Sequence, residues 1–346
     1  MGSRLPLAII AVLCIALVGL LVAEGGFPLP RVNNPSIPTG VGTPPGPGPN
    51  WTRINTGLTP SANASMMGYS PSVGGLVLVT TGAGCGPSSF TWELLGGTWV
   101  NVSATVGPGP TPARSDGGIV YDGSDGYLVL FGGYSACGMY NDTWSFSNNS
   151  WSRLTTATAP PPLYGFAMTY DASDGYVLLT GGCCVAGKLS QETWAFHHGT
   201  WANLTRGVSP AVDLDGAMTY DATLGVVVYV DGYASGYVSQ STWTFHAGNW
   251  TRSYPSGAPV NRAGMGFVYD PVLTEDLLVG GYAKVTKGVW VNLTDTWAYV
   301  GQKWKNLTAG LTTTPPFTTQ PNLMVYDPSR KQVVLFAATN GTWTFS

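Results

Sequence analysis

The chain of 346 residues is poor in charge, since Asp, Glu, Lys and Arg make up 10% of it and the formal net charge is −3. It lacks the basic excess that holds nucleic-acid phosphates, which argues against a nucleic-acid partner. Glycine (47 residues), tyrosine (17) and tryptophan (13) are abundant. This composition favours an all-β fold of short strands and tight turns.

The N-terminal segment, residues 1–26, contains an uncharged and largely apolar run over residues 5–23 that follows Arg4. A run of this length can span a bilayer, and the positive charge on its N-terminal side predicts that the rest of the chain lies outside the cytoplasm. Leu21 and Ala23 fit a cleavage site poorly, which favours an uncleaved signal anchor; a cleaved signal peptide is the alternative. We expect an extracytoplasmic domain, attached to the cell membrane or secreted if the segment is removed.

The next segment, residues 27–49, is rich in proline and glycine. Such a composition cannot build a core and favours extended polyproline conformations. We interpret it as a stalk that separates the following domain from the membrane.

Residues 50–346 form an internal repeat with a period of roughly 50 residues, marked by three recurring features. Thr-Trp pairs end at Trp92, Trp144, Trp194, Trp243, Trp297 and Trp343. A second tryptophan recurs at Trp51, Trp99, Trp151, Trp201, Trp250 and Trp304. Tyr-Asp pairs end at Asp122, Asp171, Asp221, Asp270 and Asp327, with Tyr69-Ser70 as a weaker first copy.

Each copy predicts four short antiparallel strands, because apolar runs of strand length alternate with Gly-rich and Asp-rich turns. A four-stranded sheet has two faces to bury, and stacking six such sheets around an axis buries both. The repeat begins at Trp51 with a fourth strand and ends at Trp343 with a third strand. We therefore predict a six-bladed β-propeller whose N-terminal strand completes the last blade.

The order of Tyr-Asp, an apolar strand ending in Gly-Gly, then Asp-Thr-Trp and a final tryptophan resembles the kelch motif. The glycine doublet is intact at Gly132-Gly133, Gly181-Gly182 and Gly280-Gly281. It is replaced by Thr80-Thr81, Asp231-Gly232 and Ala337-Ala338 in blades one, four and six. The resemblance implies a propeller that binds partners through the loops between strands two and three and through the links between blades.

On this predicted binding face, which points away from the stalk, aromatic residues occur together with a few charged ones. The candidate ligand-binding residues are Arg114, Tyr134, Tyr140, Tyr164, Asp213, Asp215, Tyr233, Tyr237, Arg262, Tyr282 and Trp290. Aromatic rings with a few charges suit stacking on sugars or anchoring of a protein partner. The alternative is that half of these side chains pack beneath their own loops.

No catalytic set, metal site or cofactor is predicted. The aspartates of the Tyr-Asp pairs precede turns, where an Asp side chain bonds the backbone two residues on. His197, His198 and His246 fall in turns between strands three and four, on the opposite face, which argues against a copper centre of the galactose-oxidase type on the axis. A gathering of Asp213, Asp215 and Asp231 around a cation is the minor alternative.

Four of the five cysteines lie in loops of adjacent blades, and an even number outside the cell suggests disulfides. The candidates are Cys85, Cys137, Cys183 and Cys184, whose connectivity stays open, whereas Cys14 lies in the N-terminal apolar run.

Ten Asn-X-Ser/Thr sequons predict glycosylation, which would hydrate a surface with few charges. They are Asn50, Asn63, Asn101, Asn141, Asn148, Asn203, Asn249, Asn292, Asn306 and Asn340. Part of this excess is inherited through the repeat.

The leading hypothesis is a membrane-tethered module that binds a carbohydrate or a protein at the cell surface, in adhesion or surface architecture. The alternatives are an extracytoplasmic enzyme acting on sugars and a structural envelope glycoprotein without a discrete ligand.

Overall fold

The computed structural model describes residues 48–60, 64–81, 86, 89–185, 188–210, 213–234, 237–238, 241–286, 289–316, 323–337 and 340–346. The chain divides into the units Met1–Gly48 and Pro49–Ser346, and the second holds every strand reported below. The predicted anchor (5–23) and nearly all of the predicted stalk (27–49) lie outside the described residues. Among the described residues, no helix is both long and apolar enough to cross a membrane.

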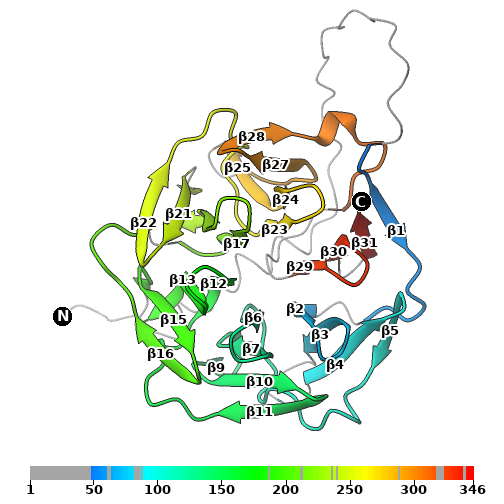
Figure 1. Ribbon diagram of the computed structural model, residues 1–346, viewed down its shortest axis with the longest axis vertical. Helices are drawn as coiled ribbons and strands as arrows, with labels where there is room; N and C mark the ends of the chain where they lie inside the picture. Colours follow the sequence, from blue (N-terminus) through cyan, green and yellow to red (C-terminus); the bar gives the residue numbers. More distant parts are fainter. Residues whose placement is uncertain are drawn as a thin grey trace, which may run out of the picture. The chain divides into compact units, whose positions relative to one another are not determined.

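The second unit is a ring of six antiparallel sheets, or blades, around a central axis (Figure 1). Blade 1 consists of β2 (Ala64–Ser70), β3 (Gly75–Thr81), β4 (Ser89–Leu95) and β5 (Thr98–Asn101). Blade 2 consists of β6 (Gly118–Asp122), β7 (Tyr127–Phe131), β10 (Thr143–Ser147) and β11 (Ser150–Leu154). Blade 3 consists of β12 (Tyr164–Asp171), β13 (Tyr176–Val185), β15 (Thr193–His197) and β16 (Thr200–Asn203), with the short β14 (Lys188–Leu189) paired to β13.

Blades 4 to 6 repeat this order. Blade 4 consists of β17 (Ala217–Asp221), β18 (Val226–Val230), β21 (Thr242–His246) and β22 (Asn249–Ser253). Blade 5 consists of β23 (Gly266–Asp270), β24 (Glu275–Val279), β27 (Thr296–Val300) and β28 (Lys303–Asn306), and a short 3-10 helix, η1 (Thr308–Gly310), follows it. Blade 6 consists of β29 (Met324–Asp327), β30 (Gln332–Ala337), β31 (Gly341–Phe345) and β1 (Trp51–Ile54). The six-bladed all-β prediction is therefore confirmed.

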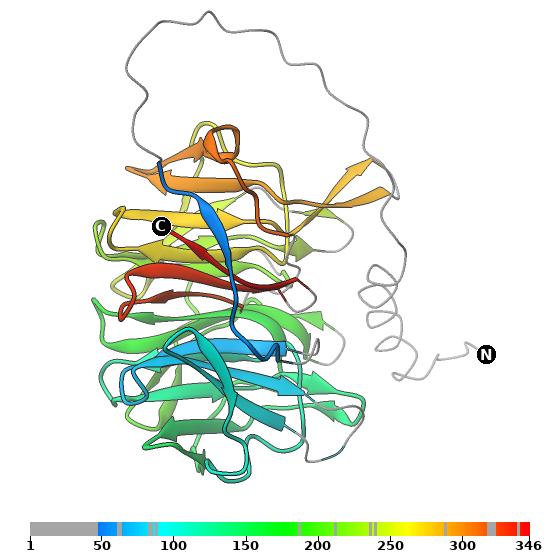
Figure 2. The same ribbon diagram turned by 90° about the vertical axis from the view of Figure 1, so that its right-hand side faces the viewer.

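The two ends of the repeat meet in blade 6. Strand β1 pairs antiparallel with β31, with Trp51 opposite Phe345 and Ile54 opposite Thr342. The blue and dark red strands lie side by side in Figures 1 and 2. This pairing joins the ends of the chain within one sheet and covers an edge of β31 that would otherwise be open.

The hydrophobic core is divided among the six junctions between neighbouring blades. One cluster, for example, packs Val79 of blade 1 against Leu128 and Phe146 of blade 2. Equivalent clusters fill the other five junctions, including the one between blades 6 and 1. A blade therefore buries both faces only when it has a neighbour on each side.

A hydrogen bond from a tryptophan to a threonine crosses every one of these junctions. The second tryptophan of each repeat donates its indole N–H to the threonine of the Thr-Trp pair in the preceding blade. The pairs are Trp51–Thr296 (3.0 Å), Trp99–Thr342 (2.8 Å), Trp151–Thr91 (2.9 Å), Trp201–Thr143 (2.9 Å), Trp250–Thr193 (2.9 Å) and Trp304–Thr242 (3.3 Å). Two of the three sequence markers thus bind to each other across blades.

We expect Thr143→Val to destabilise the propeller, because the buried indole N–H of Trp201 loses its acceptor while the side-chain volume is nearly unchanged. A buried donor left unpaired costs about 1–3 kcal/mol. Denaturant unfolding would measure the loss. Thr200→Val, at an exposed position of β16, is the matched control and should change the stability little.

Candidate functional site

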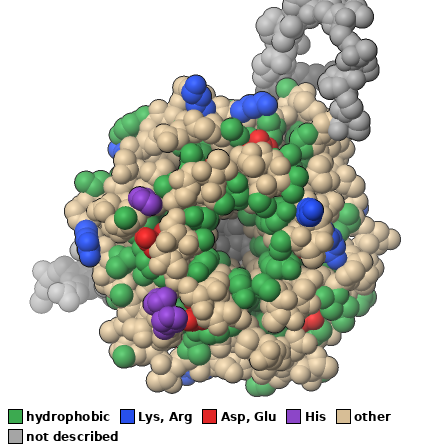
Figure 3. Space-filling view, in the orientation of Figure 1, with side chains coloured by type: hydrophobic (Ala, Val, Ile, Leu, Met, Phe, Trp, Pro, Cys, Tyr) green, Lys and Arg blue, Asp and Glu red, His purple; other side chains and the backbone are tan. Residues whose placement is uncertain are grey.

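The propeller has two faces that differ in their loops. The loop face carries the connections between strands two and three and the links between blades, whereas the turn face carries the tight turns of each blade. His198 on the turn between strands three and four of blade 3 bonds Asp125 on the turn between strands one and two of blade 2, with 2.6 Å between Nδ1 and Oδ1. The three histidines therefore lie on the turn face, as predicted, and this face is the one seen in Figure 3.

On the loop face, blade 3 extends β13 into a hairpin with β14, and three other blades carry a separate hairpin between strands two and three: β8–β9 (Tyr134–Ser135 and Gly138–Met139), β19–β20 (Tyr233–Ala234 and Tyr237–Val238) and β25–β26 (Tyr282–Thr286 and Val289–Asn292). Each of these three separate hairpins begins with a tyrosine. That tyrosine forms an isolated antiparallel β-bridge with a residue just before the innermost strand of its own blade: Tyr134 with Ser115, Tyr233 with Leu214 and Tyr282 with Ala263. Tyr134, Tyr233 and Tyr282 therefore occupy equivalent places near the axis.

All three separate hairpins follow a glycine at the second position of the doublet, namely Gly133, Gly232 and Gly281. Gly133 and Gly281 have φ angles of 93° and 90°, in the left-handed region that favours glycine. A Cβ atom on either would lie 2.6 Å from a carbonyl oxygen, that of Ser115 or of Ala263. The doublet is a packing requirement where the hairpin crosses the preceding segment.

A chain of backbone hydrogen bonds links blades 2 to 5 at the loop face. The amide of Gly165 donates to the carbonyl of Asp116, that of Asp215 to Gly165, and that of Gly264 to Asp215, at 2.8–2.9 Å. All four residues have φ angles between 52° and 66°. Blades 2 to 5 are thus tied together by residues in a left-handed conformation, two of which are aspartates.

The carboxyl groups of Asp116 and Asp215 interact electrostatically although blade 3 separates their blades. Gly165 of blade 3 forms a backbone hydrogen bond with each of these residues, and a Cβ atom on Gly165 would lie 2.8 Å from Oδ1 of Asp215. Burial raises the pKa of both carboxyl groups, and the charge of Asp116 raises that of Asp215 further. Each carboxyl group therefore keeps its proton to a higher pH than an exposed aspartate does.

Aromatic side chains surround this carboxyl pair. The Tyr282 hydroxyl donates to Oδ2 of Asp215 at 2.9 Å, and the ring centroids of Tyr134 and Tyr164 lie 4.6 Å apart. Burial and the nearby charges of Asp116 and Asp215 raise the pKa of Tyr134. The ring centroid of Trp290 lies 5.5 Å from that of Tyr233 and 5.6 Å from that of Tyr282.

We call this group the loop-face cluster: Asp116, Tyr134, Tyr164, Asp215, Tyr233, Tyr282 and Trp290. Sequence reasoning predicted six of these residues as ligand contacts and missed Asp116. The missing signal was positional, since Asp116-Gly117 and Asp215-Gly216 stand at the same place in the repeats of blades 2 and 4. The rings of Tyr134, Tyr233 and Trp290 are half-buried, whereas Tyr164 and Tyr282 are 9% exposed.

Asp213 lies beside the cluster but is fully engaged. Its carboxylate accepts hydrogen bonds from the Tyr229 hydroxyl (2.5 Å) and the Gly232 amide (2.7 Å). Burial, together with the charge of Asp231, raises its pKa to about 7. Within the described part of the chain, no three His, Cys, Asp or Glu side chains are grouped so as to hold a metal ion.

Two of the predicted ligand contacts are structural instead. Arg114 and Arg262 are 1% exposed, and each forms a two-pronged ion pair, with Asp142 and with Asp295. Each also donates to a carbonyl oxygen of the nearby glycine doublet. The prediction that they present charge to a ligand is therefore corrected: their guanidinium groups hold the hairpin base to the third strand.

The other two tyrosines predicted as ligand contacts, Tyr140 and Tyr237, are not part of the loop-face cluster. The Tyr140 ring lies 4.3 Å from the guanidinium carbon of Arg114, and its hydroxyl bonds that of Ser135 at 2.6 Å. The side chain of Tyr237 lies outside the described residues. Tyr140 therefore packs under its own hairpin, which is the alternative that the sequence left open.

The aspartates of the Tyr-Asp pairs are turn residues. In blade 2, Oδ1 of Asp122 accepts from the amides of Ser124 (2.9 Å) and Asp125 (3.2 Å). The same pattern recurs at Asp171, Asp221, Asp270 and Asp327. These bonds hold the turn between strands one and two in every blade that carries the pair.

Three of the predicted glycosylation sequons, at Asn101, Asn203 and Asn306, have a structural role of their own. In blade 3, Oδ1 of Asn203 accepts the amide of Thr205 (2.9 Å), and the Thr205 hydroxyl accepts the amide of Thr193 (3.0 Å). The same bonds recur around Asn101 and Asn306. The Ser or Thr hydroxyl accepts the amide of the third strand at the point where the fourth strand no longer pairs with it. The fold of the repeat therefore favours the Asn-X-Ser/Thr sequence at this position, independently of glycosylation. Glycan occupancy stays a prediction.

The sulfur atoms of Cys137 and Cys183 are disulfide-bonded. Cys85 and the side chain of Cys184 lie outside the described residues. The pairing among the four candidate cysteines therefore stays a prediction.

No protein-family model matches the chain, and none of the curated proteins is similar to it in sequence. Its architecture is common, since 325 chains of solved structures match it, and so the fold by itself carries no specific function. One of these, described as "Structure of YjhT", has a TM-score of 0.61 and 15% identity over 83% of this chain and 94% of that chain. At this identity the likeness shows the propeller fold alone.

We expect Asp215→Asn to remove a pH dependence of stability. A carboxyl whose pKa is raised on folding contributes stability below its unfolded pKa of about 4, and this is lost as pH rises through the folded value. The amide keeps an acceptor for Tyr282 and tolerates a left-handed φ. Melting temperatures from pH 4 to 9 should show the variant gaining on the wild type as pH rises. A constant difference would contradict the raised pKa of the Asp215 carboxyl group.

We expect Thr205→Val to lower the stability of protein made in a host without N-glycosylation, because the Thr193 amide loses its acceptor. The cost is about 0.5–1.5 kcal/mol. Thr294→Val is the control: it also removes a sequon, that of Asn292, but Thr294 makes no hydrogen bond within the described residues. Equal unfolding midpoints for both variants would refute the structural role.

Proposed function

We propose that the propeller is a binding module that recognises a carbohydrate through the loop-face cluster. The observation that supports this most is the placement of aromatic rings around the Asp116–Asp215 carboxyl pair. A sugar ring presents apolar C–H faces and a rim of hydroxyl groups. Aromatic rings stack on such faces, and carboxylates accept strong hydrogen bonds from the hydroxyls.

The kelch-like order of the repeat supports a binding role in the same region, since the hairpins that carry the cluster are the loops between strands two and three. The cluster also contains groups from four consecutive blades: Asp116 and Tyr134, Tyr164, Asp215 and Tyr233, and Tyr282 and Trp290. A ligand seated there would contact parts of the chain that only the closed ring brings together.

We further propose that this module acts outside the cytoplasm, attached to the membrane by the apolar run at 5–23 and spaced from it by the proline-rich segment. Glycans on exposed sequons would supply hydration that the sparse charges do not. Such a protein would serve adhesion or cell-surface architecture.

A sugar-active enzyme is the second candidate, and the carboxyl pair favours it specifically. Two carboxyls in one site, one protonated and one ionised near neutral pH, can act as general acid and base. Turnover of a sugar by purified protein, lost in Asp215→Asn while binding remains, would establish this candidate over a purely binding role.

Glycan-array binding followed by calorimetric titration tests the proposed function. We expect Trp290→Ala to weaken binding of the best glycan about tenfold or more, equivalent to about 1.4 kcal/mol. Tyr254→Ala is the matched control, because this ring is 75% exposed beyond β22 and outside the cluster. Unchanged affinity in Trp290→Ala, or capture of proteins with no glycan bound, would overturn the proposal of a sugar ligand.

A further inference from the structure

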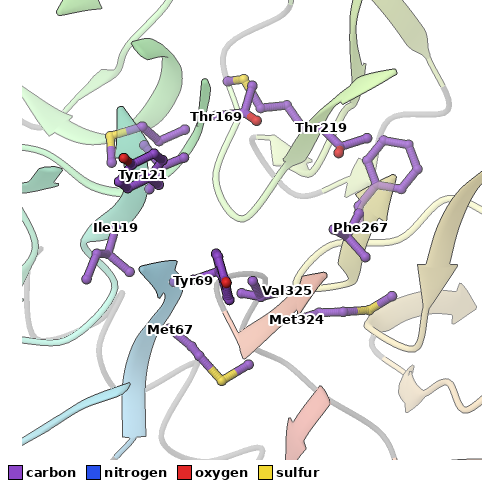
Figure 4. A pocket seen from close by; sticks show the side chains of 14 residues that line it. Met67, Tyr69, Ile119, Tyr121, Thr169, Thr219, Phe267, Met324 and Val325 are labelled. Carbon is purple, nitrogen blue, oxygen red and sulfur yellow. The ribbon is translucent and has the colours of Figure 1, made fainter. Parts of the chain in front are cut away.

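The axis of the propeller encloses a cavity of about 210 Å³. It opens in the hollow at the centre of the face in Figure 3, and Figure 4 shows the residues from all six blades that line it. The lining comes from the innermost strand of each blade, β2, β6, β12, β17, β23 and β29. The cavity thus arises from ring closure and uses no residue of the loop-face cluster.

Large apolar side chains from the cores between blades contribute their edges to the wall of this cavity and are each 2–9% exposed. They stand at one repeat position, two residues before the tyrosine of the Tyr-Asp marker: Met67, Ile119, Met168, Met218, Phe267 and Met324. Four of the six are methionines, whose flexible, polarisable side chains adapt to a bound group. None of the lining residues carries a charge.

Polar groups also line the cavity, the tyrosines Tyr69 and Tyr121 among them. Each innermost strand is the edge of its sheet, so part of its backbone faces the axis. Thr169 and Thr219 add hydroxyl groups, although that of Thr219 already accepts the Tyr269 amide at 2.9 Å. The wall therefore combines apolar side chains with hydrogen-bonding edges and has no charge to pair with an ion.

The volume suggests the size of an occupant. An apolar cavity of about 150 Å³ holds a benzene molecule, and a water molecule occupies roughly 30 Å³ in the liquid. A cavity of about 210 Å³ therefore matches one aromatic ring with a small substituent or a fused second ring. A charged ligand would lose its hydration without gaining a counter-charge.

We propose that the axial cavity is a second ligand site, which binds a small uncharged aromatic molecule that carries a hydrogen-bonding group. The ring would pack among the methionine side chains, and its polar group would bond a backbone edge or the Thr169 hydroxyl. This inference goes beyond the carbohydrate site on the loop face and does not depend on it.

Methionine residues provide the test, because they stand both inside and outside the cavity. Protein labelled with [methyl-¹³C]methionine is titrated with indole, and the signals are assigned by single Met→Leu replacements. We expect saturable shifts at Met67, Met168, Met218 and Met324, which line the cavity. Met66 and Met265 also lie in inter-blade cores but do not line the cavity, and Met139 is 37% exposed on the loop face; these three are internal controls that should not move.

A filled cavity should abolish these shifts. Thr169→Phe places a ring in the space that indole would occupy, and Thr200→Phe, exposed on β16, is its control. Unchanged Met66 and Met265 signals would show that Thr169→Phe is folded; Val268→Phe is the second filling variant. The proposal is wrong if the four cavity methyls stay unmoved up to the solubility limit of indole, or if all methionines shift alike.

Discussion

The hydrogen bond from an indole N–H to a threonine hydroxyl in the preceding blade is the interaction on which the rest of the structure depends. It occurs at all six junctions, including the one where Trp51 of the N-terminal strand reaches Thr296. Each bond is buried, so an unmade one would leave a costly donor in the core. Every junction also holds its own apolar cluster, so each blade depends on its two neighbours for the burial of its faces.

Closure in turn creates both candidate sites. Asp116 and Asp215 belong to blades that share no junction, and backbone hydrogen bonds with Gly165 of blade 3 link them at the loop face. The axial cavity likewise takes its wall from six strands that lie far apart in the sequence. Neither site exists within a single repeat, and both lie where repeat copies face each other across the axis.

Most residues that recur in the repeats stabilise the blades, whereas blade 4 replaces some of them with acidic residues. The Tyr-Asp aspartates and the Asn-X-Ser/Thr sequences at strand ends serve turns and strand termination. Arg114 and Arg262 recur at one repeat position and serve the hairpin base. In blade 4 the equivalent position holds Asp213, and the doublet there holds Asp231, so the arginine pairing is replaced by an acidic region.

The sequence by itself determined the blade count, the four strands of each blade and the closing strand, because these follow from local periodicity and from a repeat that cannot bury its faces alone. It also indicated the aromatic residues of the loop face. The tertiary structure alone decided which charged side chains could contact a ligand at the loop face. Arg114 is lost to a buried ion pair, and Asp116 is drawn into a carboxyl pair, because both outcomes depend on partners from distant segments that no local pattern encodes.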